Sequence, residues 1–228
     1  MAQILTETIS LPDGDELRVS FAEPDGVVRG GLVVLHESRG LTEAVRLMVA
    51  ALADEGWLAV APHIFRDDTE LDHEQARELL GRLHGDTVLS DTEVAIDWLA
   101  DRGIKHDVTG LIGFDLGGAV ALLVAARRPV GAAVSVAGGG IAEPVASGLP
   151  ALRDVAGQLT CPWLGLYGDQ DDVITVAEVE ALRDAAGAAR VATEVVRFPE
   201  ADHRFDTDPA AAHEAWQRAL NWFDAHLR

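Results

Sequence analysis

The sequence contains one cysteine, Cys161, and one tyrosine among its 228 residues. A single cysteine excludes an intramolecular disulfide, and its place before Pro162 and an apolar run indicates the start of a buried strand. No apolar run approaches the ~20 residues that span a bilayer. Because the N-terminus also lacks a basic segment followed by apolar residues, we expect a cytoplasmic protein that does not enter membranes.

Basic residues are also few, with 18 Lys and Arg against 38 Asp and Glu and a formal net charge of −20. A field of this sign repels phosphate backbones and anionic membrane surfaces, which argues against nucleic-acid and membrane-surface binding. Nothing in the composition marks a second domain or a long linker. We therefore expect a single domain over residues 1–228, present as a monomer or homodimer.

Apolar runs of strand length alternate with amphipathic segments of helix length, which is typical of an α/β fold. Residues 7–11 and 17–21 alternate with period two around a Pro-Asp-Gly-Asp turn, which predicts an antiparallel hairpin at the sheet edge. Buried parallel strands are predicted at residues 31–35, 58–61, 109–114, 132–137, 163–167 and 193–198. Helices are predicted at residues 42–55, 73–83, 92–102, 117–128, 176–186 and 209–227.

Asp115 lies at the centre of a strand–turn–helix motif, Gly113-Phe114-Asp115-Leu116-Gly117-Gly118. A G-x-nucleophile-x-G turn exposes its central side chain at the top of a parallel sheet, and its glycines let strand and helix approach closely. That central residue is usually Ser or Cys. A carboxylate there changes the feasible chemistry, because its attack on an ester forms a high-energy anhydride, whereas its attack on a saturated carbon forms a hydrolysable ester.

Other reactive residues follow the predicted strands, at the carboxyl ends where open parallel sheets bind ligands. Glu37 follows the strand at 31–35, Asp171 follows the strand at 163–167, and His203 follows the last strand. The order nucleophile, acid, histidine is the one that α/β-hydrolases use, and here it falls at Asp115, Asp171 and His203.

The acid of this triad stands in an acidic cluster with Asp169 and Asp172. The G-x-x-D spacing after the strand favours Asp171. Such a cluster is also found in phosphatase-type Asp-x-Asp sites and cation sites, but no neighbouring set of Asp, Glu and His completes a ligand shell.

Several segments together resemble the dienelactone hydrolase family of α/β-hydrolases over nearly the whole chain: Val33–Leu41, Ala59–Pro62, Gly113–Gly118, Gly168–Asp171 and His203–Phe205. The resemblance implies an α/β-hydrolase fold, with a mostly parallel central sheet flanked by helices. In the family the turn residue is normally Cys, activated by the histidine, and a glutamate in the position of Glu37 interacts with the resting thiol. Here Asp115 replaces that Cys.

An Asp at this turn also resembles the nucleophile of haloalkane and haloacetate dehalogenases and of epoxide hydrolases, which usually insert a helical cap domain. The stretch between the strands at 132–137 and 163–167 is too short for a cap. A tyrosine pair for epoxide opening is missing, because Tyr167 is the sole tyrosine. We therefore expect a cap-less, dienelactone-hydrolase-like scaffold that carries a dehalogenase-type nucleophile.

The role of each residue follows from its charge and from the resemblance. Asp115 would displace a leaving group from the substrate. His203, oriented by Asp171, would then act as general base on the water that cleaves the alkyl-enzyme ester. By carry-over from the family, the N–H groups of Ser38 and Leu116 would form the oxyanion hole.

The substrate-binding residues are less sharply indicated. Two carboxylates close together cannot both ionise cheaply, so Glu37 is predicted to be protonated or turned toward a base such as Arg39. Arg39 and Arg204 are candidates to bind a substrate carboxylate through two hydrogen bonds. In the family two arginines bind that carboxylate, and their places here hold His73, which we keep as a substrate-binding candidate, and Thr207.

The sequence thus predicts a small-molecule hydrolase that forms an ester on Asp115, with a halogenated carboxylic acid or a similar activated alkyl compound as substrate. Two alternatives stay open: ester or lactone hydrolysis with Asp115 as a base toward water, and a non-catalytic binding protein that retains the pocket. No cofactor or metal is expected, because three side chains supply attack, proton transfer and orientation.

Overall fold

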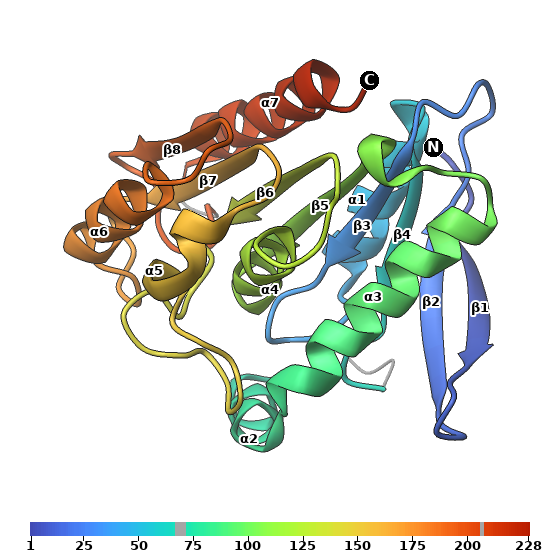
Figure 1. Cartoon of the computed structure of the whole chain (residues 1–228), viewed down its shortest axis with the longest axis horizontal. Helices are drawn as coiled ribbons and strands as arrows, with labels where there is room; N and C mark the ends of the chain where they lie inside the picture. Colours follow the sequence, from blue (N-terminus) through green and yellow to red (C-terminus); the bar gives the residue numbers. More distant parts are fainter. Residues whose placement is uncertain (67–71, 206–207) are drawn as a thin grey trace.

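Eight strands form one sheet within the residues that the computed structural model describes, which are 1–66, 72–205 and 208–228, with the backbone alone at His73 and Arg77. The strands are β1 Leu5–Ser10, β2 Glu16–Ala22, β3 Gly31–Leu35, β4 Leu58–Pro62, β5 Thr109–Phe114, β6 Ala132–Val136, β7 Trp163–Gly168 and β8 Thr193–Phe198. They lie in the order β1-β2-β4-β3-β5-β6-β7-β8 (Figure 1).

The two N-terminal strands form the antiparallel edge that the sequence predicts. β1 pairs with β2 from Leu5 opposite Phe21 to Ser10 opposite Glu16, and β2 pairs antiparallel with β4. All pairs from β4 through β3 to β8 are parallel. Parallel pairing places the carboxyl ends of β3, β5, β7 and β8 at the same edge of the sheet.

Helices cover both faces of this sheet: α1 Glu43–Asp54, α2 His73–Arg82, α3 Gly85–Asp101, α4 Leu116–Ala125, α5 Leu152–Val155, α6 Val176–Ala186 and α7 Pro209–His226. One apolar cluster joins α1 and α7 to one face of the sheet. A second cluster joins α3, α4 and α6 to the other face, the near side in Figure 1. The predicted α/β architecture, a mostly parallel central sheet flanked by helices, is confirmed.

Helix α4 fixes the position of the turn at Asp115. All ten of its residues are buried. A helix that is apolar all round is held by packing on every side. The start of α4 is therefore a rigid support for the residue that precedes it.

Two helix predictions differ from the structure. α3 begins at Gly85 and not at Thr92, because the 137–162 connection packs against its start: the Gly85 N–H donates to Ser147 O at 2.8 Å, and Leu149 covers Gly85. The same connection contains the short α5 and a 3₁₀ turn at Ala156–Gln158, which the apolar pattern does not predict. These long-range contacts leave no local sequence signal.

The connection between β6 and β7 contains no cap domain, as predicted. Residues 137–162 form loops, α5 and the 3₁₀ turn at Ala156–Gln158. None of the helices in the described ranges combines the length and the apolar character that a bilayer crossing needs.

The close approach of β5 and α4 gives a prediction for Gly113. A Cβ added there would lie 2.0 Å from the Gly117 carbonyl oxygen, so backbone atoms would have to move. We expect Gly113→Ala to lower the free energy of unfolding by about 3 kcal/mol in urea denaturation. The matched control is Gly81→Ala in α2, where an added Cβ meets nothing within 4 Å. This change should raise the free energy of unfolding by roughly 0.5–1 kcal/mol. Equal small effects of the two changes would contradict this packing.

Candidate active site

Asp115 follows β5 in a sharp bend with φ 49° and ψ −113°. Few residues other than glycine adopt a positive φ, so this bend is strained. Asp is a favoured N-cap residue, and Asp115 stands at the N-cap of α4, yet its side chain makes no capping hydrogen bond. The bend instead turns the carboxylate away from its own helix and toward the neighbouring loops.

The Asp115 carboxylate has a different partner for each oxygen. Oδ2 accepts a hydrogen bond from the Ser38 N–H at 3.2 Å. Oδ1 lies 3.6 Å from His203 Nε2. Ser38 follows β3 and His203 follows β8, so parallel pairing brings these loops to Asp115 at one edge of the sheet.

Asp171 holds the other side of the histidine. Its Oδ2 accepts from His203 Nδ1 at 2.7 Å, and its Oδ1 accepts from the N–H groups of Val173 and Ile174 at 2.7 and 2.8 Å. The Asp171 side chain is 1% exposed. These bonds fix both the carboxylate and the orientation of the imidazole ring.

The other members of the acidic cluster do not contact His203. Asp169 accepts two hydrogen bonds of 2.7 Å from Arg197, and Asp172 is exposed. Within the described ranges, no three His, Cys, Asp or Glu side chains are grouped as ligands for a metal ion. The geometry therefore brings Asp171, the residue favoured by the spacing, to the histidine.

The electrostatics of the site depend on the two carboxylates beside His203. Asp115 first and Asp171 second raise the pKa of His203 to about 10, against the opposing effect of burial. Burial alone would raise the pKa of Asp115, but His203 and hydrogen bonds from Ser38 outweigh it and lower that pKa below its ordinary value. At neutral pH the resting site thus holds an imidazolium between two carboxylates.

Glu37 is paired with Arg204. Its Oε2 lies 3.4 Å from a guanidinium nitrogen of Arg204. A nearby positive charge favours the ionised form of a carboxyl group, so this pairing reduces the cost of a second carboxylate beside Asp115. Arg39 is half-buried on the same loop as Glu37 and, in the described part of the chain, is not among the residues that line the cavity at Asp115.

Leu116, His73 and Thr207 from the sequence interpretation, and the neighbouring His36, are placed as follows. Leu116 is the first residue of α4, where helical N–H groups have no intrahelical partner. The His73 side chain and all of Thr207 lie outside the described residues. His36, next to Glu37, is buried and accepts a hydrogen bond from Ile64 N–H, and burial lowers its pKa to about 4. It is therefore a neutral residue that ties two loops together.

A cavity of about 200 Å³ opens beside Asp115. Its walls come from the loops after β3 and β8, from α1, and from the ends of β5 and β6: Glu37, Ala44, Val45, Met48, Phe114, Asp115, Val136, Ala137, His203 and Arg204. The sequence interpretation did not identify the α1 residues of this wall. Their helix is amphipathic, and the residues that face a cavity have the same apolar character as those that face the core.

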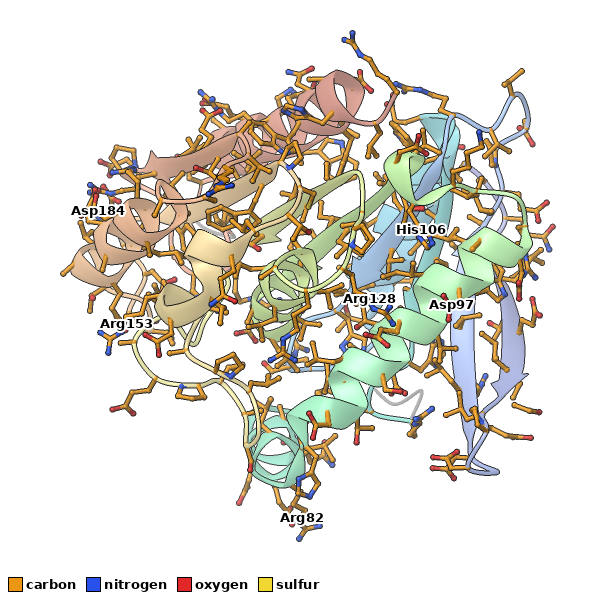
Figure 2. The ribbon with its side chains drawn as sticks, viewed as in Figure 1. Arg82, Asp97, His106, Arg128, Arg153 and Asp184 are labelled. Atoms are coloured by element: carbon orange, nitrogen blue, oxygen red, sulfur yellow. The ribbon has the colours of Figure 1, made fainter. Side chains whose placement is uncertain are left out.

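A smaller hollow of about 60 Å³ lies at the opposite ends of the parallel strands. Asp97, His106 and Arg128, labelled in Figure 2, contribute to its lining. His106 precedes β5, so this hollow is at the amino ends of the parallel strands. Ligands of open parallel sheets bind at the carboxyl ends, which favours the cavity at Asp115.

The family model described as "Dienelactone hydrolase family" matches residues 17–227. The chain belongs to this family. Similar proteins include "Putative carboxymethylenebutenolidase" of Yersinia pestis, 34% identical over 96% of this chain and 88% of that protein, and "Carboxymethylenebutenolidase" of Rhodococcus opacus, 27% identical over 99% and 93%. A crystal structure of "Putative Dienelactone Hydrolase" from Klebsiella pneumoniae is 31% identical over 98% of this chain and 100% of that one, with a TM-score of 0.84.

Family membership confirms the two coarse predictions from the sequence. The chain has an α/β-hydrolase fold, and it is a hydrolase. The alternative of a non-catalytic binding protein is therefore set aside. The role of each site residue is a separate question, because this chain has Asp115 where the resemblance leads one to expect Cys.

The charge coupling in the site gives a prediction for the His203 pKa. We expect Asp115→Asn to lower it from about 10, because the largest cause of the raised pKa, the hydrogen bond with the Asp115 carboxylate, is lost while Asp171 remains. Imidazole resonances followed by NMR against pH measure this value. In the wild type these ion pairs stabilise the fold fully between the pH at which both carboxylates are ionised and about pH 6.5, and they are lost as the pH rises through about 10. The variant should lose its remaining His203 contribution at a lower pH.

The control for this titration is Asp172→Asn, which removes an exposed carboxylate next to Asp171. It should leave the His203 pKa unchanged. An equal His203 pKa in Asp115→Asn and in the wild type would show that Asp115 is not electrostatically coupled to the histidine.

Proposed function

We propose that this protein hydrolyses a small activated alkyl compound, such as a halogenated carboxylic acid, through a covalent ester on Asp115. The observation that supports this proposal is the orientation of the Asp115 carboxylate. Its Oδ2 accepts the N–H of Ser38, the group that the family resemblance assigns to the oxyanion hole, while Oδ1 faces His203 at the cavity wall. The Ser38 N–H can therefore donate a hydrogen bond to the carbonyl oxygen of the ester that Asp115 would form.

In the first step, Asp115 Oδ1 forms a bond to a saturated carbon of the substrate, and the leaving group departs with the bonding electron pair. The lowered pKa of Asp115 keeps the carboxylate ionised for this attack. Oδ2 becomes the carbonyl oxygen of the new ester and keeps its hydrogen bond from Ser38. No anhydride forms, because the attacked atom is not an acyl carbon.

The first step also prepares the base for the second. Esterification weakens the interaction of Asp115 with the imidazolium, whose hydrogen bond is the largest cause of the raised pKa of His203, so the imidazolium releases its proton to solvent. The neutral imidazole, held by Asp171, can then accept a proton from water. His203 therefore changes from a counter-ion to a general base only after the ester has formed.

In the second step, water attacks the ester carbonyl carbon while His203 takes one of its protons. The negative charge that develops on Oδ2 is stabilised by the Ser38 N–H and, by the resemblance, by the Leu116 N–H. Collapse passes the proton from His203 to the departing alcohol. The other water proton passes from Asp115 back to His203, which restores the resting ion pair.

Ester or lactone hydrolysis is the second candidate function, because the relatives from Yersinia pestis and Rhodococcus opacus carry names of the carboxymethylenebutenolidase type. In that route Asp115 acts as a base toward water and does not bond to the substrate. A substrate carbonyl would then have to displace Asp115 Oδ2 from the Ser38 N–H. A neutral acceptor makes the weaker hydrogen bond there, so we prefer the covalent route.

A trapping experiment separates the two routes. Haloacids, epoxides and aryl esters are first screened side by side with the wild type to find a compound that turns over. In His203→Ala the attack by Asp115 should persist, while hydrolysis of the ester slows by about 10²–10⁴-fold. Intact-protein and peptide mass spectrometry should therefore detect the alkyl group on the peptide that contains Asp115.

The matched control is His213→Ala on the exposed side of α7, which should turn over normally and accumulate no adduct. The double variant Asp115→Asn, His203→Ala should accumulate none either. Turnover of aryl esters by the wild type, with no adduct on His203→Ala at any time, would contradict the covalent route and favour the second candidate.

A further inference from the structure

The active-site cavity has a neighbour that shares its wall. A second cavity of about 220 Å³ lies on the same face of the sheet, lined by Met48, Ile112, Phe114, Val136, Arg204, Phe205, Ala212, Ala215, Trp216 and Ala219. Met48, Phe114, Val136 and Arg204 line both cavities. We call the second cavity the α7 chamber. It adjoins the site at these four side chains.

The spacing of two helices explains why the α7 chamber exists. α1 packs on β2, β3 and β4, and α7 packs on β6 and β7. β5 lies between these two groups of strands in the sheet, so the carboxyl end of β5 lies in the interval between the two helices. Alternate residues of a strand share a face, which places Ile112 and Phe114 of β5 on the floor of this interval.

Small side chains on α7 keep the interval open. Ala212, Ala215 and Ala219 are spaced three and four residues apart, so they share one face of the helix. Met48, Phe114, Val136, Ala212 and Trp216 are only partly buried although they pack against the apolar cluster of this face. Among the described residues of this wall, the helix contributes three alanines, which fill less space than larger side chains would.

The lining of the α7 chamber is apolar except at its junction with the site. Arg204 is the one charged side chain among the described residues that line it, and Arg204 also lines the cavity at Asp115, where it is paired with Glu37. Small-molecule sites are mostly apolar with a few polar groups that fix orientation, and their volumes are roughly 300–1,000 Å³. The two cavities together have a volume in this range, and their lining is mostly apolar with a few polar groups beside Asp115.

We infer that the α7 chamber binds an apolar chain or ring of the substrate, attached to the carbon that Asp115 attacks. The inference rests on the proposed function for the identity of that carbon. The favoured substrate is then an activated alkyl compound that carries an apolar chain of several carbons, in preference to a two-carbon haloacid. Specificity for the chain resides in α1, β5 and α7, outside the triad.

The chain offers a direct probe of this site, because its two methionines are Met1 and Met48. Met1 is 85% exposed, and Met48 lies in the wall that both cavities share. Protein labelled with ¹³C at the methionine methyl groups gives one resonance for each, assigned with Met48→Leu. Primary alcohols from 1-butanol to 1-hexanol, the product class of the proposed hydrolysis, serve as unreactive ligands.

We expect saturable shifts of the Met48 resonance and none of Met1. The dissociation constant should fall about fourfold for each added methylene, as expected for burial of a CH₂ group. Ala212→Phe fills the chamber from its partly exposed side and should weaken 1-hexanol binding at least tenfold. Ala225→Phe, on an exposed position of the same helix, is the matched control and should bind as the wild type does.

Circular dichroism and cooperative urea unfolding verify that each variant is folded. If Ala212→Phe does not fold, Trp216→Leu replaces it and should weaken 1-hexanol binding at least threefold by removing part of the wall. Dissociation constants that do not depend on chain length, or wild-type affinity in the filled variant, would overturn the inference. Because no reaction takes place, this outcome is independent of whether His203→Ala accumulates an adduct.

Discussion

The position of the Asp115 carboxylate between the Ser38 amide and the His203 ring is the contact on which the site depends. It requires the bend at φ 49°, which in turn requires glycine at 113 and 117, where the strand, the helix and the β3 loop meet. The side chain gives up a helix cap that is typically worth about 0.5–2 kcal/mol. The packing of α4 on all sides makes that loss tolerable.

This contact also explains how one histidine can have two roles. While Asp115 is charged, His203 is held as an imidazolium by two carboxylates. In the proposed mechanism, esterification of Asp115 would remove one of the two charges and make the imidazole available as a base. In that mechanism, the electrostatics of the site would set the order of the two chemical steps.

Much of the fold was predictable, because buried parallel strands and the G-x-D-x-G turn have strong local patterns. The start of α3 was not, because Ser147 and Leu149 define it from a distant loop. The spacing favoured Asp171 as the partner of His203, but it did not show why Asp169 is not that partner. Asp169 is held by Arg197, which comes from the neighbouring strand in the sheet. The sequence left the partner of Glu37 open, and a loop that follows the last strand supplies Arg204. The α7 chamber could not be predicted because it depends on the distance between two helices. In the sequence, alanines on the face of a helix look the same as alanines packed in the core.

The central claim is that Asp115 bonds to the substrate, and oxygen transfer tests it most directly. A single turnover with enzyme in excess is run in water enriched in ¹⁸O. The masses of the product and of the peptide containing Asp115 are then measured by mass spectrometry. The covalent route predicts an unlabelled oxygen in the first product and one heavy oxygen in Asp115. Heavy oxygen in the first product, with none in Asp115, would contradict it.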